Sequence, residues 1–221
     1  MKKPSATQRR FLLSVAKGIG VNNKGCFPWR EKARPYPTFV AEFLLQRTGA
    51  AQATSVFEKV LSLYPDLNSL CEARREDVLA VLFPLGLQHR NRAFCQAIGE
   101  LADRKPRTIP SSYEVLIGLH GVGRYTASAV LCFGFGKRIG LIDPNIVRVY
   151  ERYFRLSSVK ARKHTDDALW TFSDALVQDS VGSPRYTNWG LLDIGRTVCK
   201  KKPLCDVCPL ASKCAHSREQ Q

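Results

Sequence analysis

The chain has 221 residues, 44% of them hydrophobic and 24% charged, and these ordinary globular values exclude a disordered polypeptide. Its 34 lysines and arginines outnumber 19 acidic residues, and the net charge of +15 favours a polyanionic partner, nucleic acid first and an anionic membrane surface second. No uncharged run reaches the roughly 18 residues that a membrane-spanning helix needs. The early apolar run 11–13 is too short for a signal peptide, so we expect an intracellular protein, cytoplasmic and nucleoid-associated in a prokaryote.

Apolar residues at helical spacing predict an all-α chain. Ser5 is expected to cap a first helix that ends at Gly20, and a loop rich in glycine, proline and charge follows over 21–37. Thr38 is expected to open the next helix. Further helices are predicted over 51–64, 73–83 and 90–104.

In the second half, Ser111 and Glu114 have the spacing of a capping box before another helix. The remaining helices are predicted over 124–133, 143–150, 165–176 and 183–199. The stretch 138–142 leans toward β structure but is too short to predict a strand.

The eight cysteines fall into two groups. Four are scattered along apolar stretches and are expected to be buried, reduced thiols: Cys26, Cys71, Cys95 and Cys132. The other four follow a C-x5-C-x2-C-x5-C pattern near the end: Cys199, Cys205, Cys208 and Cys214. Four thiolates this close can enclose one metal centre, which would supply a core for a segment too polar to pack alone. The single C-x2-C pair favours a [4Fe–4S] cluster, with zinc as the alternative.

The segment 116–127 has the pattern of a helix, a tight turn and a second helix. Gly121 and Gly123 permit positive φ and close backbone approach. The exposed N–H groups that start the second helix could hold a DNA phosphate. A plain helix–helix turn explains the same pattern.

Segment 116–127 also resembles the helix–hairpin–helix of the DNA glycosylase superfamily that includes endonuclease III and the adenine glycosylases. The typical motif is L-P-G-V-G-x-x-T-A, and His120 replaces its proline. Segment 141–149 is similar to the family's V-D-x-N-V-x-R-V, whose aspartate is catalytic. The run 27–48 resembles the P-W…P-Y…E-x-x-L-Q-Q-T pattern of the adenine glycosylase branch. The last cysteines resemble a C-x6-C-x2-C-x5-C cluster loop, with a first interval one residue shorter that requires a tighter loop.

The resemblance implies two helical lobes with an active-site cleft between them. A six-helix domain with the hairpin would cover 27–137, and 1–26 plus 138–221 would form a helical domain with the iron–sulfur loop. Tyr125 stands where bifunctional members carry a nucleophilic lysine, so no Schiff base can form there and little or no lyase activity is expected. The end of the chain just after the cysteines, and the absence of a tyrosine in 84–90, make it most similar to the short mismatch-specific thymine-DNA glycosylases.

Glycosidic bond cleavage builds positive charge on the sugar, which a carboxylate stabilises while a second carboxyl group protonates the leaving base. The resemblance assigns Asp143 to cation stabilisation and water activation, and Glu42 to base protonation or water positioning. Tyr125 would line the pocket for a flipped base. Asp143 before Pro144 is also an ideal helix cap, and one carboxylate can do both; Glu42 could instead face solvent.

The expected DNA contacts come from the hairpin, from the end of the helix that carries Glu42, and from two further segments. They are Gly121, Val122, Gly123, Arg124, Gln46, Arg47, Leu87 and Arg148. Arg47 and Leu87 would fill the gap left in the duplex or touch the base left unpaired, and Arg148 would meet the phosphate backbone. Arg47 could equally be one more solvated charge.

We therefore expect a monomeric, monofunctional glycosylase that removes thymine or uracil opposite guanine from duplex DNA, with no membrane association. Removal of adenine opposite guanine or 8-oxoguanine is the alternative within the class, and a modified pyrimidine is a third. A non-enzymatic iron–sulfur redox sensor that binds DNA would share the charge and the cysteines. It would not need Glu42 and Asp143 together.

Overall fold

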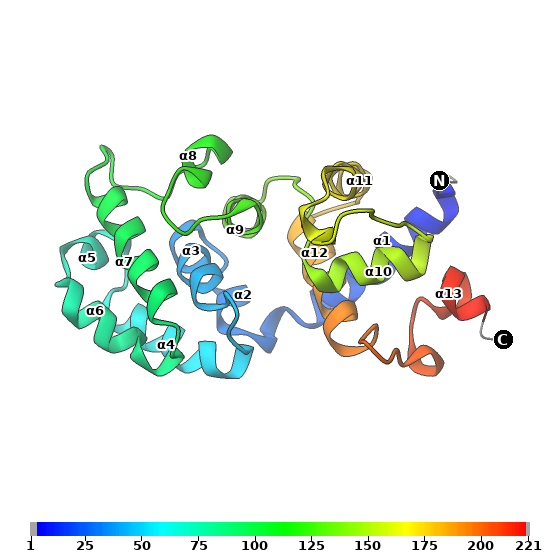
Figure 1. The fold of residues 1–221 in the computed structure, drawn as a ribbon, viewed down its shortest axis with the longest axis horizontal. Helices are drawn as coiled ribbons and strands as arrows, with labels where there is room; N and C mark the ends of the chain where they lie inside the picture. The colour runs from blue at the N-terminus through cyan, green and yellow to red at the C-terminus, as the bar shows by residue number, and fades with distance from the viewer. Residues whose placement is uncertain (1–3, 220–221) are drawn as a thin grey trace. The chain divides into compact units, whose positions relative to one another are not determined.

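The computed structural model describes residues 4–219, and within this range the regular structure is entirely helical (Figure 1). The prediction of an all-α chain is confirmed, and 138–142 forms no strand. None of the helices in this range combines the length and the apolar character that crossing a membrane requires.

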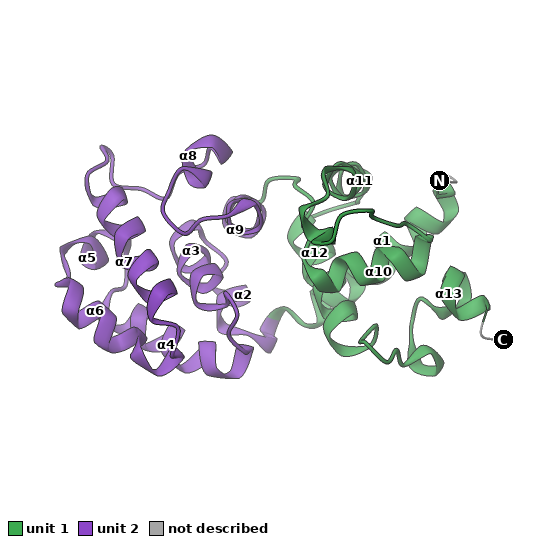
Figure 2. Ribbon diagram, in the orientation of Figure 1, with its two compact units in different colours: residues 1–24, 136–221 green, residues 25–135 purple. Residues whose placement is uncertain are grey.

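The chain folds into two compact units (Figure 2). The first unit, drawn in green, combines the N-terminal segment up to Lys24 with everything from Gly136 onward, and the second, drawn in purple, is Gly25–Phe135. These divisions lie two residues before the boundaries predicted at 27 and 137.

The second unit contains eight described α-helices where six were expected, and several of them are short. They are α2 (Pro28–Glu31), α3 (Pro35–Leu44), α4 (Ala50–Leu63), α5 (Leu67–Glu72), α6 (Arg75–Leu82), α7 (Gln88–Ala102), α8 (Tyr113–Ile117) and α9 (Arg124–Ala129). A π-helical turn, Val130–Gly134, continues α9. Helix α5 was not predicted, although Asp66 caps it by accepting a hydrogen bond from the Ser69 backbone N–H at 2.8 Å.

Helix α3 is buried along most of its length and forms the centre of the second unit. Its Phe39 and Phe43 rings lie 5.2 Å apart, and Phe94 of α7 packs 5.3 Å from the Phe43 ring. The helix begins at Pro35 and not at Thr38, because proline in the first helical turn sacrifices no hydrogen bond and its fixed φ suits the helix. Thr38 is therefore an interior residue of the helix.

The first unit is built from five described α-helices. They are α1 (Ala6–Asn22), α10 (Pro144–Phe154), α11 (Asp167–Gln178), α12 (Pro184–Thr197) and α13 (Ala215–Arg218). Ser5 caps α1 as predicted, since its hydroxyl accepts a hydrogen bond from the Gln8 N–H at 3.2 Å. Helices α1 and α12 touch through their backbones: a Cβ on Gly20 would collide with Tyr186, and one on Gly190 with Ala16.

One predicted cap and one predicted helix start are wrong. The hydroxyl of Ser112, and not that of Ser111, accepts from the Val115 N–H and caps α8. Helix α11 begins at Asp167 and not at Thr165, and Asp166 caps it through the Ala168 N–H at 3.0 Å. In both places two neighbouring residues are of types that can cap a helix.

Candidate functional site

Glu42 lies in the last turns of α3 and is only 6% exposed, so the alternative that it faces solvent is wrong. Burial raises the pKa of its carboxyl group from 4.5 to about 8, and the nearby Arg30 guanidinium partly opposes that rise. Arg30 is itself 6% exposed and sits 4.9 Å above the Phe27 ring. The Glu42 carboxyl group is therefore protonated near neutral pH, which is the state that a proton donor requires.

The hairpin joins α8 to α9 through a turn held by two backbone hydrogen bonds, from Leu119 N–H to Leu116 C=O and from Val122 N–H to Leu119 C=O, each 3.1 Å. Gly121 has φ +74°, and a Cβ there would lie 2.9 Å from the Ala93 side chain, so both conformation and space require glycine. Gly123 has φ −92°, so of the two glycines only Gly121 uses the positive φ that both permit.

Gly123 is the N-cap of α9, and a Cβ built on it would meet nothing within 4 Å. This side of the turn is therefore open to a partner that approaches the backbone. Arg124 and Tyr125 follow in the first turn of α9, and both are half-buried.

Gln46, just after α3, ties this helix to the hairpin. Its Nε2 donates to the Gly121 carbonyl at 3.2 Å and to Thr126 Oγ1 at 3.3 Å. Four residues predicted to contact DNA line one recess of about 420 Å³ in this unit: Gln46, Arg47, Leu87 and Gly121. His89 and His120 line the same recess, and His120 replaces the proline of the family motif.

In the first unit, Asp143 is the N-cap of α10, as its position before Pro144 predicted. Its Oδ1 accepts from the Ile146 N–H at 2.7 Å, and its Oδ2 accepts from Asn145 Nδ2 at 2.8 Å. Burial raises the pKa of Asp143, while these hydrogen bonds and the Arg148 guanidinium oppose the rise. The Asn145 backbone N–H also stabilises the carboxylate and so helps to lower the pKa of Asp143.

Arg148 was predicted to meet a DNA phosphate, but the structure uses its donors within the protein. Nε donates to the Cys199 carbonyl at 2.6 Å, and Nη2 donates to the Gly195 carbonyl at 2.7 Å and to Asn145 Oδ1 at 2.8 Å. The last carbonyls of a helix have no partner within that helix, which makes them good acceptors for an arginine. Arg148 therefore links α10, whose first turn carries Asp143, to the end of α12 and the first clustered cysteine.

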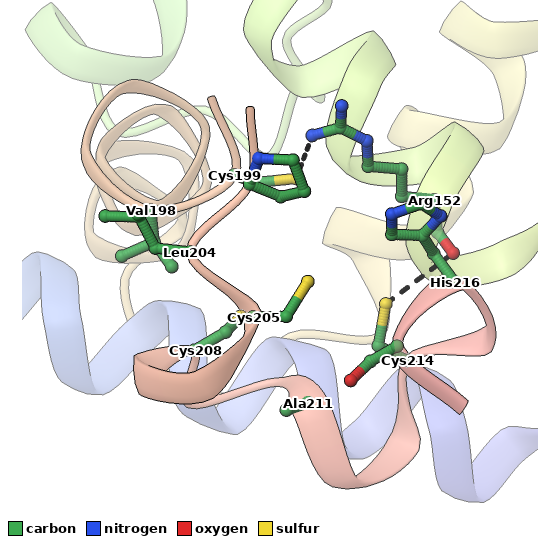
Figure 3. A pocket seen from close by; sticks show the side chains of 11 residues that line it. Arg152, Val198, Cys199, Leu204, Cys205, Cys208, Ala211, Cys214 and His216 are labelled. Atoms are coloured by element: carbon green, nitrogen blue, oxygen red, sulfur yellow. Dashed lines mark hydrogen bonds between the residues drawn. The ribbon is translucent and has the colours of Figure 1, made fainter. Parts of the chain in front are cut away.

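The four clustered cysteines line one cavity of about 20 Å³ (Figure 3). Arg152, one turn after Arg148, donates from Nη1 to Cys199 Sγ at 3.5 Å, and Cys214 Sγ donates to the Arg152 carbonyl at 3.6 Å. The short interval between Cys199 and Cys205 forms a tight loop, because the Leu204 N–H donates to the Val198 carbonyl at 3.1 Å.

No disulfide joins any of the eight cysteines. Of the four scattered ones, Cys132 is buried as expected, whereas Cys71 and Cys95 are only partly buried and Cys26 is exposed. Within residues 4–219 no three histidine, cysteine or acidic side chains are arranged as ligands of one metal ion. The donor set nevertheless fits a thiolate-bound centre, because four sulfur atoms surround one cavity and Arg152 donates to one of them. Burial, together with the other thiols, raises the pKa of Cys205 and Cys208, so their thiolate forms need a cation beside them.

Sequence reasoning missed four residues that shape these sites: Arg30, Arg90, Asn145 and Arg152. Arg148 and Arg152 lie four residues apart on one helix and therefore face the same side of it. This spacing could have indicated Arg152. Nothing in the local sequence marks Arg90, because most of its partners lie more than 40 residues earlier, at the end of α3 and just after it.

Comparison with known proteins finds relatives across almost the whole chain. A thymine-DNA glycosylase from Aeropyrum pernix is 37% identical over 191 residues, which cover 86% of each chain. A thymine/uracil-DNA glycosylase from Pyrobaculum aerophilum is 38% identical over 84% of this chain and 81% of its own. The human adenine DNA glycosylase is 31% identical, but the match spans only 37% of its length. No family model matches the chain.

Solved structures agree with these relatives. A thermostable thymine-DNA glycosylase superposes with a TM-score of 0.86 at 27% identity, covering 96% of this chain and 98% of its own. An endonuclease III–DNA covalent intermediate superposes with a TM-score of 0.77 at 20% identity, which shows a shared fold. The chain belongs to the thymine/uracil-DNA glycosylase family of the helix–hairpin–helix superfamily.

Proposed function

We propose that the protein is a monofunctional DNA glycosylase that hydrolyses the N-glycosidic bond of thymine or uracil opposite guanine in duplex DNA. The observation that carries this proposal is the buried, protonated carboxyl group of Glu42 in a chain whose relatives are thymine/uracil-DNA glycosylases. A protonated acid at this position suits departure of a pyrimidine, which leaves as an anion unless it receives a proton.

The reaction needs two carboxyl groups in opposite protonation states. Glu42 gives its proton to a carbonyl oxygen of the leaving base as the bond to the sugar C1′ breaks. Asp143 stabilises the positive charge on the sugar and takes a proton from the water that attacks C1′. The products are a free base and an abasic site, and Glu42 regains a proton from solvent.

Asp143 can stay ionised although burial raises its pKa. Two donors, the Ile146 N–H and Asn145 Nδ2, stabilise the carboxylate, and its place at the start of α10 adds the favourable helix dipole. The helix cap is therefore part of how the catalytic charge is maintained.

Tyr125 supports the monofunctional assignment. A phenol in the first turn of α9 cannot form the Schiff base through which an amine cleaves the sugar–phosphate backbone. In this role Tyr125 lines the pocket that holds the extruded base, and the expected lyase activity is little or none.

Duplex DNA with a mismatched or damaged base is the proposed partner. The net charge of +15 favours phosphate, and the hairpin offers the open side of Gly123 next to Arg124. Arg47 and Leu87 then occupy the duplex where the base has left the stack, from the recess that they share.

We further propose that Cys199, Cys205, Cys208 and Cys214 hold a [4Fe–4S] cluster. Bound there, the cluster would cross-link residues 199–214, a segment with little apolar core of its own, and would supply no step of the hydrolysis. Purified protein is expected to absorb near ~400 nm and to contain iron and not zinc. Zinc without iron would contradict the cluster and leave the glycosylase proposal intact.

A panel of labelled duplexes tests the activity. Incubation with G·T, G·U, A·G and A·8-oxoguanine duplexes followed by alkali is expected to cleave the thymine strand of G·T and the uracil strand of G·U. Cleavage confined to the adenine strands would favour the adenine glycosylase alternative. Absence of cleavage on G·T and G·U would contradict the proposed substrate.

A further inference from the structure

A buried arginine in the second unit has no acidic partner. Arg90, in the first turn of α7, is 5% exposed and forms no ion pair with any residue in the range 4–219. Burial of an unpaired cation is unfavourable unless its donors are well satisfied. The partners that satisfy Arg90 therefore indicate what it does.

Arg90 binds the backbone at the end of α3. Its Nη1 lies within hydrogen-bonding distance of the Leu44 carbonyl at 2.9 Å, the Gln46 carbonyl at 3.0 Å and Thr48 Oγ1 at 2.6 Å. Nε and Nη2 donate to Asn91 Oδ1 at 3.3 and 3.2 Å, and Asn91 is anchored in turn to the Leu82 carbonyl. The guanidinium group thus joins the start of α7 to residues 44–48.

Arg47 lies between these anchored residues and differs from them in two ways. Its φ is +58°, in the left-handed region that a residue other than glycine rarely adopts. Its exposed side chain has no hydrogen bond or ion pair with any described residue, although it lines the recess of about 420 Å³ with Leu87 and two histidines. On the opposite side, Gln46 is tied to the hairpin through Gly121.

An arginine held in this way suits recognition of guanine. An unpaired guanine has two neighbouring acceptors, O6 and N7, which match the paired donors of one guanidinium group. A guanidinium group with no partner among the described residues is available for that contact, whereas every nitrogen of the Arg90 guanidinium group already donates within the protein.

We infer that Arg90 is a positioning residue for recognition of the base left unpaired opposite the extruded one. It holds the backbone of 44–48 in the strained conformation that directs Arg47 into the recess. The inference rests on the proposed function, since it needs an unpaired guanine as the ligand. Arg90 itself does not touch DNA.

Binding to duplexes that carry a stable abasic analogue, tetrahydrofuran, tests the inference without any turnover. One duplex places the analogue opposite guanine and the other opposite a second tetrahydrofuran, so that no base is present to read. Fluorescence anisotropy is expected to show wild-type protein binding the guanine duplex about tenfold more tightly, the scale of one bidentate base contact. Arg47→Ala and Arg90→Lys are each expected to abolish that preference, and with Arg90→Lys the affinity for the duplex without guanine is expected to stay within about twofold.

Arg92→Lys is the matched control, because Arg92 lies on the same helix, is exposed and has no partner among the described residues. It is expected to keep the preference. The double variant Arg47→Ala/Arg90→Lys should lose as much of the preference for the guanine duplex as either single variant, because both substitutions remove the same contact.

Three outcomes would overturn the inference. Arg90→Lys could keep the tenfold preference, or it could weaken binding to both duplexes equally. In the third outcome, wild-type protein excises uracil opposite guanine yet shows no preference for the guanine duplex. The last outcome would leave the proposed function standing, whereas failure both to excise and to bind would contradict the proposed function itself. If Arg90→Lys does not fold, Thr48→Val decides the matter. It removes the hydroxyl group that accepts from Arg90 at 2.6 Å and donates to the Gln46 carbonyl at 3.5 Å, and it is expected to reduce the preference in the same direction.

Discussion

Replacing Glu42 with glutamine removes the buried carboxyl group and keeps the shape of the side chain. In the folded protein the pKa of Glu42 is raised from 4.5 to about 8, mainly by burial. Between these pH values the folded state keeps a proton that the unfolded chain releases, so the free energy of unfolding of the wild type falls as pH rises. At about 1.36 kcal/mol for each pH unit, the full fall is up to about 5 kcal/mol by pH 8.

Glu42→Gln has no proton to lose and should not show this fall. The free energy of unfolding of the variant, minus that of the wild type, is expected to increase steadily from pH 5 to pH 8 and to stay constant above pH 8. Urea unfolding at pH 5, 7 and 9 measures the difference directly. Glu58→Gln, an exposed glutamate on α4, is the control and is expected to show no pH-dependent gain.

The same carboxyl group sets the expected pH profile of excision. If Glu42 donates its proton to the leaving base, single-turnover excision of uracil by the wild type falls as pH rises through about 8, the pKa of Glu42. The variant should excise slowly at every pH. A stability difference that does not grow with pH, or a wild-type rate that rises through pH 8, would refute the reasoning.

Three further predictions concern Asp143, Gly195 and Tyr125. Asp143→Asn keeps a good helix cap but loses the charge, so excision is expected to fall by at least about 10²-fold while duplex affinity and melting temperature change little; a large loss of binding would contradict this. Gly195→Ala places a Cβ 2.7 Å from that of Asn145, a partner of Asp143, and should lower the free energy of unfolding by about 1–3 kcal/mol along with excision. Unchanged stability would show that α10 and α12 can separate freely at this point. Tyr125→Lys introduces an amine in the first turn of α9 and is expected to give a DNA adduct trapped by borohydride, which wild type should not form.

The sequence was most informative where a short local pattern has one physical solution. Periodic apolar residues predicted the all-α fold, and Ser5 and Asp143 were recognisable as caps because the acceptor and the N–H that it binds lie three residues apart. Where two solutions compete locally, the prediction failed. Pro35 starts α3 ahead of Thr38, since proline is favoured in the first helical turn.

The arginines show why the rest of the site was not predictable. The sequence gives each the same charge, but only tertiary structure decides whether the donors meet protein carbonyls or stay available. Arg148 binds the carbonyls of Gly195 and Cys199, whereas Arg47 has no partner among the described residues. The elevated pKa of Glu42 likewise depends on the packing around all sides of α3.

The most direct test of the account is to identify what leaves a G·U duplex under single-turnover conditions. Wild-type protein is expected to release free uracil, detected by mass spectrometry, and to leave the strand intact until alkali is added. Asp143→Asn is expected to release none over the same time while still binding the duplex. Strand cleavage without alkali, or equal uracil release by Asp143→Asn, would contradict the claim that Asp143 and Glu42 together hydrolyse the N-glycosidic bond.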